Sequence, residues 1–402
     1  MQTGFVLSPQ EIWGMLSTLE ASAEKTEQAL APLRDNYYRT RVKEIVEEHY
    51  DLGTLVYIGE IFGGTVNRNF EVRMEKNGVT TSWFFRKYIE YKEVKEILYE
   101  HHLLLHLRER GFRLTASPVR AKNGETYVPC EFGDDTSYFA IYEYLPGDDV
   151  YQWERNNVSA KTCDSVARTL AAFHAAACDY APEEGWGNNE PIIREQLDYY
   201  WPNIKKHLEV IRQDPGNDLF TRYLDAKSEY LEDVISRLQK IFLRDDELVK
   251  TVLHTDAHPG NFKYEDDLVV GMFDFDWPKT DVRLYEVAIA AHFFACSWES
   301  HNNGEANLDL VGAFVRAYQD EMSKFKCAVP PLSPYEIEVF AEMMAIGSMY
   351  VVHFCTNKCC TVPDTNIFEY FYYTQHQLRC VEWIDEHSAE IRAVVRNACG
   401  ID

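Results

Sequence analysis

Three features are scarce in this chain: basic residues, long apolar runs and regularly spaced cysteines. It has 40 Lys and Arg against 65 Asp and Glu, a formal net charge of −25, and such a surface repels nucleic acid and anionic membranes. The longest weakly polar run, Met343 to Cys355, is too short to cross a bilayer and predicts a buried helix instead. We therefore expect neither nucleic acid nor a membrane among the partners.

The cysteines also give no sign of a disulfide framework. There are 10 of them, without the spacing of a disulfide scaffold, and the first residues, MQTGFVLSPQ, lack the basic and apolar pattern of a secretory signal. Both observations predict a cytoplasmic protein with reduced thiols. One Cys-rich stretch, residues 353–360, lies at an expected helix end, and we assign no metal to it.

Internal repeats and low-complexity tracts are absent, which excludes solenoid and disordered classes. Hydrophobic residues make up 46% of the chain and aromatic residues 14%, enough for a substantial core. The 402 residues suffice for two domains or for one large bilobal enzyme.

The most informative stretch is residues 251–277. Within it, His254, Asp256 and Asn261 fill the pattern H-x-D-x-x-x-x-N without a gap. A second acidic cluster, Phe-Asp-Phe-Asp, follows, and Asp274 is its first carboxylate. The combination of both patterns is far more specific than either alone.

The residues between these two patterns predict a β-hairpin. Apolar runs at 262–264 and 268–273 flank a polar Glu-Asp-Asp turn. Because a hairpin brings its two ends together, Asp256, Asn261 and Asp274 would surround one small space. Phosphoryl transfer from a nucleotide needs such a set: one carboxylate accepts the proton of an attacking hydroxyl, while an amide and a second carboxylate hold Mg²⁺ against the phosphates.

This stretch resembles the catalytic core of the kinase-like small-molecule phosphotransferases, the group of aminoglycoside phosphotransferases, choline kinases and homoserine kinases. Protein kinases have Arg after the His and Gly two places after the second Asp, whereas this chain has Thr255 and Asp276. The resemblance implies an α+β, bilobal, protein-kinase-like fold with a mostly β small lobe and a helical large lobe. It implies that Asp256 is the catalytic base and that Asn261 and Asp274 hold the metal.

The resemblance extends upstream to a nucleotide-binding region. Gly63 and Gly64 match the glycine pair of the family's first hairpin, where backbone N–H groups approach phosphate oxygens closely. A predicted strand ends in a basic pair, where the family places its phosphate-binding residue. Arg86 matches that position, but Lys87 stays an alternative because successive strand residues face opposite ways.

Two further segments complete the implied nucleotide site. A helix predicted over residues 93–110 carries Glu100, which fits the family's E-H-x-L-L and would orient Arg86. The strand that ends near residue 145 resembles the family's hinge. There the Glu143 carbonyl and the Leu145 N–H would bind the adenine ring.

Two motifs are left structural. Residues 281–288 resemble the family's G-P-x-x-[YF]-D-[LV]-A, but they lack the Pro and carry Glu286 where Asp is usual, so a bracing role for this residue stays open. His174 ends an L-x-x-[LF]-H pattern on an apolar helix face. Such a His is most often a satisfied core residue.

The implied organisation has three segments: a helical N-terminal extension over 1–50, a nucleotide-binding small lobe over 51–147 that ends in the hinge, and a helical large lobe over 148–402 with the catalytic loop and the acceptor site. The resemblance implies ATP and Mg²⁺ as cofactors. The acceptor would be a hydroxyl of a sugar, amino alcohol, hydroxy amino acid or aminoglycoside-like compound. The oligomeric state stays open, a homodimer being one option.

Two other functions are compatible with parts of the sequence. A kinase-like binding protein would keep the fold with little turnover, although a scaffold has no need of all three polar groups. A metal-dependent hydrolase would use His254, Asp256 and His258 as ligands, since His and carboxylate suit zinc. That alternative leaves Asn261 and Asp274 unexplained.

Overall fold

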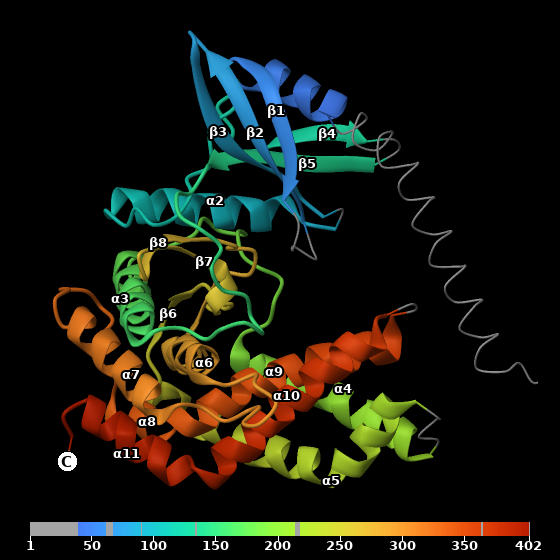
Figure 1. The fold of residues 1–402 in the computed structure, drawn as a ribbon, viewed down its shortest axis with the longest axis vertical. Helices are drawn as coiled ribbons and strands as arrows, with labels where there is room; N and C mark the ends of the chain where they lie inside the picture. Colours follow the sequence, from blue (N-terminus) through green and yellow to red (C-terminus); the bar gives the residue numbers. More distant parts are fainter. Residues whose placement is uncertain are drawn as a thin grey trace, which may run out of the picture. The chain divides into compact units, whose positions relative to one another are not determined.

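The computed structural model divides the chain into two compact units. The first comprises residues up to Tyr91 together with Pro118–Tyr144, and the second comprises Lys92–Ser117 and Leu145–Asp402. No helix within the described parts of the chain is long and apolar enough to cross a membrane. The structure describes residues 39–61, 67–89, 91–132, 135–213, 218–362 and 365–401 (Figure 1).

The first unit is built on a five-stranded antiparallel sheet with the strand order β1-β2-β3-β5-β4. Asn77 and Gly78 form the turn between the second and third strands, with φ of 55° and 78°. Two positive φ values give the turn whose twist matches that of the paired strands. The strands are β1 (Thr54–Ile61), β2 (Arg68–Lys76), β3 (Val79–Lys87), β4 (Val128–Phe132) and β5 (Asp135–Glu143).

One face of this sheet packs against a helix at residues 39–49. Val42, Ile45 and Val46 recur at helical spacing and are all buried in the core of the unit, which also contains Phe85 from β3. Alternate side chains of each strand point to the opposite face of the sheet. The first helix expected within residues 1–50 lies outside the described residues.

The second unit is mostly helical. Its central helix is α6, in which every residue from Arg283 to Ala295 is buried, as expected for a helix surrounded by others. Helices α9 and α10 lie side by side (Figure 1). The helices are α2 (Val94–Glu109), α3 (Ala160–Ala177), α4 (Ile193–Gln213), α5 (Leu219–Leu238), α6 (Arg283–Ala295), α7 (Leu308–Met322), α8 (Pro334–Glu338), α9 (Phe340–Thr361), α10 (Ile367–Glu386) and α11 (Ser388–Ala398), with the 3₁₀ segments η1 (Gln239–Glu247) and η2 (Pro259–Asn261).

A glycine lets α9 approach α6 closely. A Cβ added at Gly347 would lie 2.1 Å from the Cγ2 atom of Ile289, far inside van der Waals contact. Any larger residue would push the two helices apart. This packing anchors the buried α6.

Two small antiparallel sheets complete the second unit. One pairs β6 (Lys250–Leu253) with β9 (Lys279–Val282), and the other pairs β7 (Phe262–Glu265) with β8 (Leu268–Met272). The predicted hairpin is therefore confirmed. Its two-residue turn is Asp266-Asp267, with φ of 49° and 65°, and Asp tolerates this left-handed conformation better than most residues.

Helix α2 belongs to the second compact unit, whereas the expected division placed residues 93–110 in the small lobe. The helix itself is confirmed at Val94–Glu109, capped by a Glu93–Glu96 capping box. The first turn of α2 is held by a contact within the second unit: Asn189 N donates to Glu96 Oε1 at 3.3 Å. The chain passes from the first unit to the second between Tyr144 and Leu145, and the three-segment division stays a prediction.

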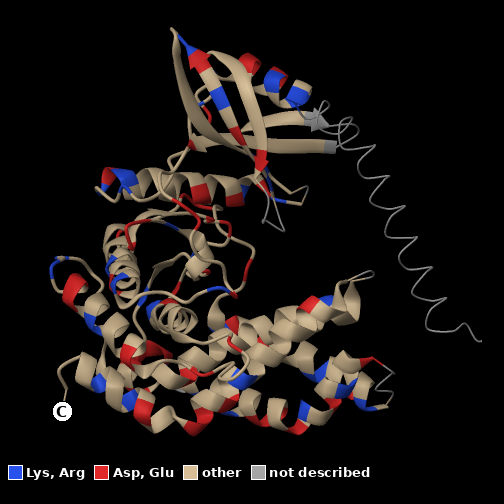
Figure 2. Ribbon diagram, viewed as in Figure 1, with Lys and Arg blue, Asp and Glu red and all other residues tan. Residues whose placement is uncertain are grey.

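Charge is distributed over both units. Figure 2 shows Lys and Arg interspersed with Asp and Glu along the helices of the second unit rather than gathered into one basic region. This arrangement agrees with a chain of formal charge −25.

Candidate active site

The H-x-D-x-x-x-x-N stretch forms a loop between β6 and the β7–β8 hairpin. Phe273 N donates to the Asn261 carbonyl at 3.1 Å, next to the first and last residue pair of the hairpin, Phe262 and Met272. This bond brings the end of the loop against the residue that precedes Asp274. The structure thus brings together the two predicted metal ligands, as the hairpin prediction required.

Asn261 is also tied to Asp256. Its Nδ2 donates to the Asp256 carbonyl at 2.8 Å and to the Asp256 carboxylate oxygen Oδ2 at 3.0 Å. Both bonds use the amide nitrogen, so the amide oxygen Oδ1 is the atom left to bind another group. The Asp256 side chain is 48% exposed, which leaves it accessible to a substrate hydroxyl.

His254 braces the loop from beneath. Its Nδ1 accepts from Asp256 N at 3.3 Å, so its Nε2 carries the proton and donates to the Phe273 carbonyl at 2.7 Å. Both ring nitrogens are committed, and the fully buried ring cannot bind a metal. The hydrolase alternative therefore loses its first ligand.

His258, the third ligand of that alternative, has a local role as well. Its Nδ1 accepts from Gly260 N at 3.1 Å, and its Nε2 lies 3.6 Å from Asp256 Oδ2. Burial lowers the pKa of His258, so the ring is neutral at pH 7 and acts as a cap of η2. The neutral His258 ring therefore places no positive charge beside the Asp256 carboxylate.

Two residues of the site have a strained backbone. Thr255 has φ of 74° and Asp274 has φ of 67°, in a region that non-glycine residues, and β-branched ones above all, rarely adopt. Such conformations persist where surrounding contacts hold them and often mark functional sites. Thr255 is held by two bonds: its N donates to Glu286 Oε1 at 2.5 Å and its Oγ1 donates to the Trp277 carbonyl at 3.0 Å.

Glu286, whose bracing role the sequence left open, is bonded to His174, which was expected as a core residue. The second carboxylate oxygen of Glu286 lies 2.7 Å from His174 Nε2, and His174 Nδ1 lies 2.8 Å from Tyr318 OH. Glu286, His174 and Tyr318 are fully buried. This chain of bonds runs from α7 through α3 and α6 to the strained Thr255. The L-x-x-[LF]-H and Y-E-V-A patterns were the available signals.

The two basic candidates for the phosphates lie on opposite faces of the first unit's sheet. Lys87 is on the side of Phe85, which faces the helix at 39–49. Arg86 is on the other side, where it is 5% exposed and its Nε donates to Asn69 Oδ1 at 3.3 Å. Its guanidinium also lies over the Tyr142 ring at 5.8 Å. The Arg86 assignment stays a prediction that this register favours.

The other residues predicted to bind the nucleotide belong to both units, and their roles stay predictions. Glu100 is 2% exposed on α2, in the second unit, whereas Arg86 belongs to the first, and their pairing stays a prediction. Glu143 is the last residue of β5, and Leu145 begins the second segment of the second unit. The Gly63 and Gly64 pair lies outside the described residues.

Directly after the hinge, a glycine fixes the path of the chain. Gly147 has φ of 87°, and a Cβ there would lie 2.4 Å from Val270 Cγ2. The next residue, Asp148, exchanges two backbone hydrogen bonds with Tyr264 on β7 at 3.0 and 3.1 Å. The chain that leaves the hinge is therefore anchored on the catalytic hairpin.

With this geometry in place, comparison with known proteins decides the family. Residues 58–326 match the profile of the phosphotransferase enzyme family. The chain belongs to this family. Relatives of this phosphotransferase include the homoserine kinases of Granulibacter bethesdensis, 26% identical over 277 residues, or 67% of this chain and 73% of the relative, and of Cupriavidus taiwanensis, 24% identical over 305 residues, or 75% and 80%.

Solved structures support the same fold. A microcompartment-associated aminopropanol kinase superposes with a TM-score of 0.62 at 13% identity, covering 88% of this phosphotransferase and 98% of that chain. The amicoumacin kinase hAmiN, in complex with AMP-PNP, Ca²⁺ and Ami, superposes with a TM-score of 0.61 at 14% identity, covering 89% and 96%. The predicted α+β, protein-kinase-like fold is confirmed, and the protein is a small-molecule kinase.

The hydrogen bonds that join Glu286 to Thr255 and His174, called the Glu286 bridge here, can be tested by mutation in this phosphotransferase. Glu286→Ala leaves two buried donors, Thr255 N–H and the His174 ring, without an acceptor, which costs about 1–3 kcal/mol each. The strained loop then loses its anchor, and a displacement of about 1 Å can lower kcat on the order of 10²-fold. Steady-state kinetics and a thermal melt measure both effects.

A matched control is a buried glutamate of α8 that pairs with the first residue of α6. Glu336 forms a buried ion pair with Arg283 of α6 and does not touch Thr255, so Glu336→Ala should lower the melting temperature while the folded enzyme keeps its kcat. Equal losses of kcat in the two variants, measured well below either melting temperature, would contradict a positioning role for Glu286.

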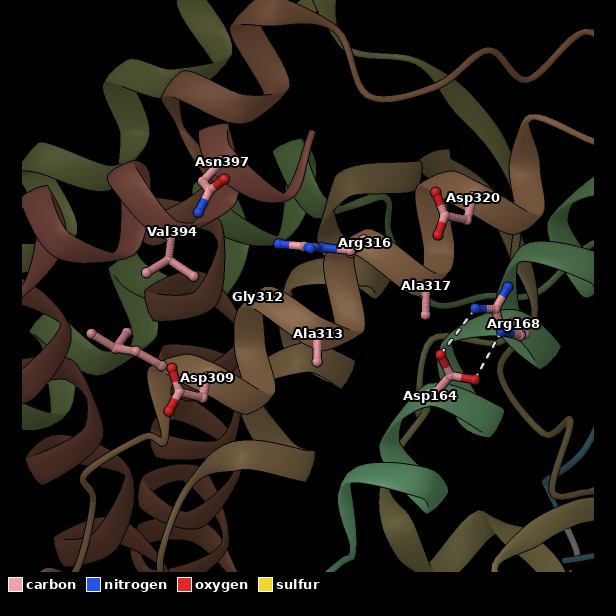
Figure 3. Close-up of a pocket in the computed structure, with 11 residues that line it drawn as sticks. Asp164, Arg168, Asp309, Gly312, Ala313, Arg316, Ala317, Asp320, Val394 and Asn397 are labelled. Atoms are coloured by element: carbon pink, nitrogen blue, oxygen red, sulfur yellow. Dashed lines mark hydrogen bonds and ion pairs between the residues drawn. The ribbon is translucent and has the colours of Figure 1, made fainter. Parts of the chain in front are cut away.

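One pocket of the second unit lies apart from the predicted catalytic loop. It measures about 360 Å³ and lies among α3, α7 and α11 (Figure 3). Arg168 on its wall is already paired with Asp164 at 2.8 and 3.0 Å. None of its lining residues belongs to the catalytic loop or to the β7–β8 hairpin, so we do not place the acceptor there.

Proposed function

We propose that this kinase transfers the γ-phosphate of ATP, with Mg²⁺, to the hydroxyl of a small amino-bearing acceptor, and that homoserine is the first acceptor to test. The observation that carries the proposal is the Asp256 carboxylate held by Asn261 at the base of the hairpin that ends at Asp274. The homoserine kinase names of the relatives support the acceptor class. The AMP-PNP and Ca²⁺ in the amicoumacin kinase structure support a nucleotide and a divalent cation.

Asp256 is proposed as the general base. It would accept the hydroxyl proton as the new oxygen–phosphorus bond forms and the bond between the γ-phosphorus and the leaving ADP oxygen breaks. The Asn261 amide holds carboxylate oxygen Oδ2, so Oδ1 is the oxygen that faces the acceptor. A fixed carboxylate needs little reorganisation when the proton moves.

The donor set fits Mg²⁺, which prefers carboxylate and amide oxygens. Because the Asn261 nitrogen is committed to Asp256, its oxygen Oδ1 is the available ligand, and Asp274 follows Phe273, whose N–H is bonded to the Asn261 backbone. Asn261 and Asp274 would therefore hold the ion. When bound, Mg²⁺ neutralises charge that develops on the phosphates.

The acceptor side of Asp256 is acidic and aromatic. Burial, together with the charges of Asp256 and Glu190, holds the pKa of the Tyr285 phenol well above its usual value. Burial and the same two carboxylates also raise the pKa of Tyr350. Glu190 also accepts a hydrogen bond from the Tyr200 hydroxyl. A carboxylate that acts on the same two tyrosines as the base suits an ammonium group, as in an amino alcohol or a hydroxy amino acid.

A coupled ADP-release assay over a panel of acceptors tests the proposal. Homoserine or a related amino alcohol should stimulate ADP release well above the rate without acceptor, and 4-hydroxybutyrate, which lacks the amino group, should stimulate it less. A preference for sugars would overturn the acceptor class. Binding of nucleotide without turnover on any acceptor would favour the kinase-like binding protein.

The basic pair on β3 is tested separately. Arg86→Ala should raise the KM for ATP and lower kcat together, with kcat/KM falling about 10- to 100-fold, because a charge-assisted bond serves ground state and transition state alike. Lys87→Ala is the matched control and should stay near wild type, since Lys87 lies on the opposite sheet face. If Lys87→Ala proves the damaging variant, the wrong face of β3 has been assigned to the nucleotide.

A further inference from the structure

Two His-x-x-x-Cys pairs of the second unit converge far from each other in sequence. His292 and Cys296 lie at the end of α6, and His376 and Cys380 lie within α10. Residues four apart on a helix share one face, so each pair presents an imidazole and a thiol to the other helix. All four residues are buried, with exposures from 0% to 4%.

The distances among these groups are those of a compact ligand set. His376 Nε2 lies 3.5 Å from Cys380 Sγ and 3.8 Å from Cys296 Sγ. One ring nitrogen of His292 and the two sulfurs lie within 4.8 Å of one another. Around a tetrahedral zinc ion, with Zn–S of about 2.3 Å and Zn–N of about 2.0–2.1 Å, a sulfur and a nitrogen are about 3.6 Å apart.

Neighbouring groups orient the imidazole of His376 for a cation. Its Nδ1 lies 2.9 Å from Asn303 Oδ1, an acceptor, which fixes the proton on Nδ1 and leaves the Nε2 lone pair directed at the two sulfurs. Its ring stacks on Trp298 with a centroid separation of 3.3 Å. Asn156 Nδ2 lies 3.8 Å from Cys296 Sγ, where an N–H donor stabilises a thiolate.

His292 supplies a second, independent observation. Its Nε2 lies 3.4 Å from Ser348 Oγ, whereas its Nδ1 is buried without a hydrogen-bond partner in the part of the chain that the structure describes. A buried polar atom without a partner is costly.

We propose that His292, Cys296, His376 and Cys380 bind one Zn²⁺ ion as a structural site. His292, Cys296 and Cys380 form the mutually close set, and His376 adds a fourth ligand within 3.8 Å of both sulfurs. Zinc prefers two thiolates and two imidazoles, and four protein ligands leave no position for substrate. The ion would link α6 to α10. Since α6 also carries the Glu286 bridge at its other end, zinc would stabilise the scaffold of the catalytic loop without taking part in phosphoryl transfer.

Metal analysis of the purified full-length protein, expressed with zinc in the medium, tests the site. About one zinc ion per chain is expected, and Cys380→Ser or His376→Gln should reduce it to a small fraction. Cys355→Ser removes another fully buried thiol outside the cluster and should keep the zinc. Asp256→Asn should keep it as well, which separates this site from any metal at the catalytic loop.

Because a ligand variant can fail to fold, the wild type provides the decisive measurement. After zinc is exchanged for Co²⁺, tetrahedral thiolate ligation gives intense visible d–d bands and a near-ultraviolet charge-transfer band, and chelation should lower the melting temperature. Absence of both zinc and cobalt thiolate bands would overturn the proposal. So would a Cys296–Cys380 disulfide found by thiol titration and peptide mapping, since two thiolates could then not bind the ion. Neither result bears on the acceptor assay.

Discussion

Replacing Asp256 with Asn is expected to lower kcat by about 10²- to 10⁴-fold, the usual contribution of general base catalysis. Asn has the same shape and can still accept the bond from Asn261 Nδ2, which in the wild type measures 3.0 Å, so the loop should keep its structure. Only the ability to take a proton is lost. ADP-release kinetics measure kcat, and calorimetry should show nearly unchanged nucleotide affinity.

The control for this variant makes the same chemical change at the turn of the adjacent hairpin. Asp266 lies at the turn between β7 and β8 with φ of 49°, a conformation that Asn also tolerates. Asp266→Asn should therefore leave kcat near the wild-type value. Wild-type turnover in Asp256→Asn would remove Asp256 from the role of base and with it the central residue of the proposed mechanism.

Loss of the Asp274 carboxylate is expected to have the other large effect. A metal ligand that neutralises phosphate charge contributes several kcal/mol to the transition state, so Asp274→Ala should lower kcat on the order of 10³-fold or more. Mg²⁺-dependent nucleotide binding should weaken in the same variant. Titration of nucleotide with and without Mg²⁺ measures this directly, and circular dichroism checks the fold.

Asp274→Asn separates charge from backbone strain. Ala at φ of 67° is strained in its own right, whereas Asn adopts this conformation readily. If the carboxylate holds the ion, Asn should impair Mg²⁺-dependent binding nearly as much as Ala. If both variants bind nucleotide with Mg²⁺ as the wild type does, Asp274 is not a metal ligand.

Much of the local structure around the site was predictable. The β7–β8 hairpin follows from two apolar runs around a polar turn, and the helix expected over residues 93–110 is α2, Val94–Glu109. Both elements depend on residues that lie close together in the sequence. For the same reason, Asp256, Asn261 and Asp274 were expected to converge before the fold was known.

The bridge from Tyr318 through His174 and Glu286 to Thr255 was not predictable in this way. His174 and Glu286 are 112 positions apart, and Glu286 and Thr255 are 31 apart. No periodic pattern connects such residues. The Y-E-V-A motif even departs from the family's usual Asp, and only the packing of α3 against α6 shows that the longer side chain still reaches the loop.

By itself, the sequence determined the class of chemistry, the order of the motifs and the short elements that carry them, because these depend on residue types at fixed local spacing. The tertiary structure decided the rest. Sheet register placed Arg86 and Lys87 on opposite faces, and helix packing joined His292 and Cys296 to a second pair 80 residues away. Long-range contacts arise from burial of apolar faces, which brings polar side chains together without leaving a pattern in the linear chain.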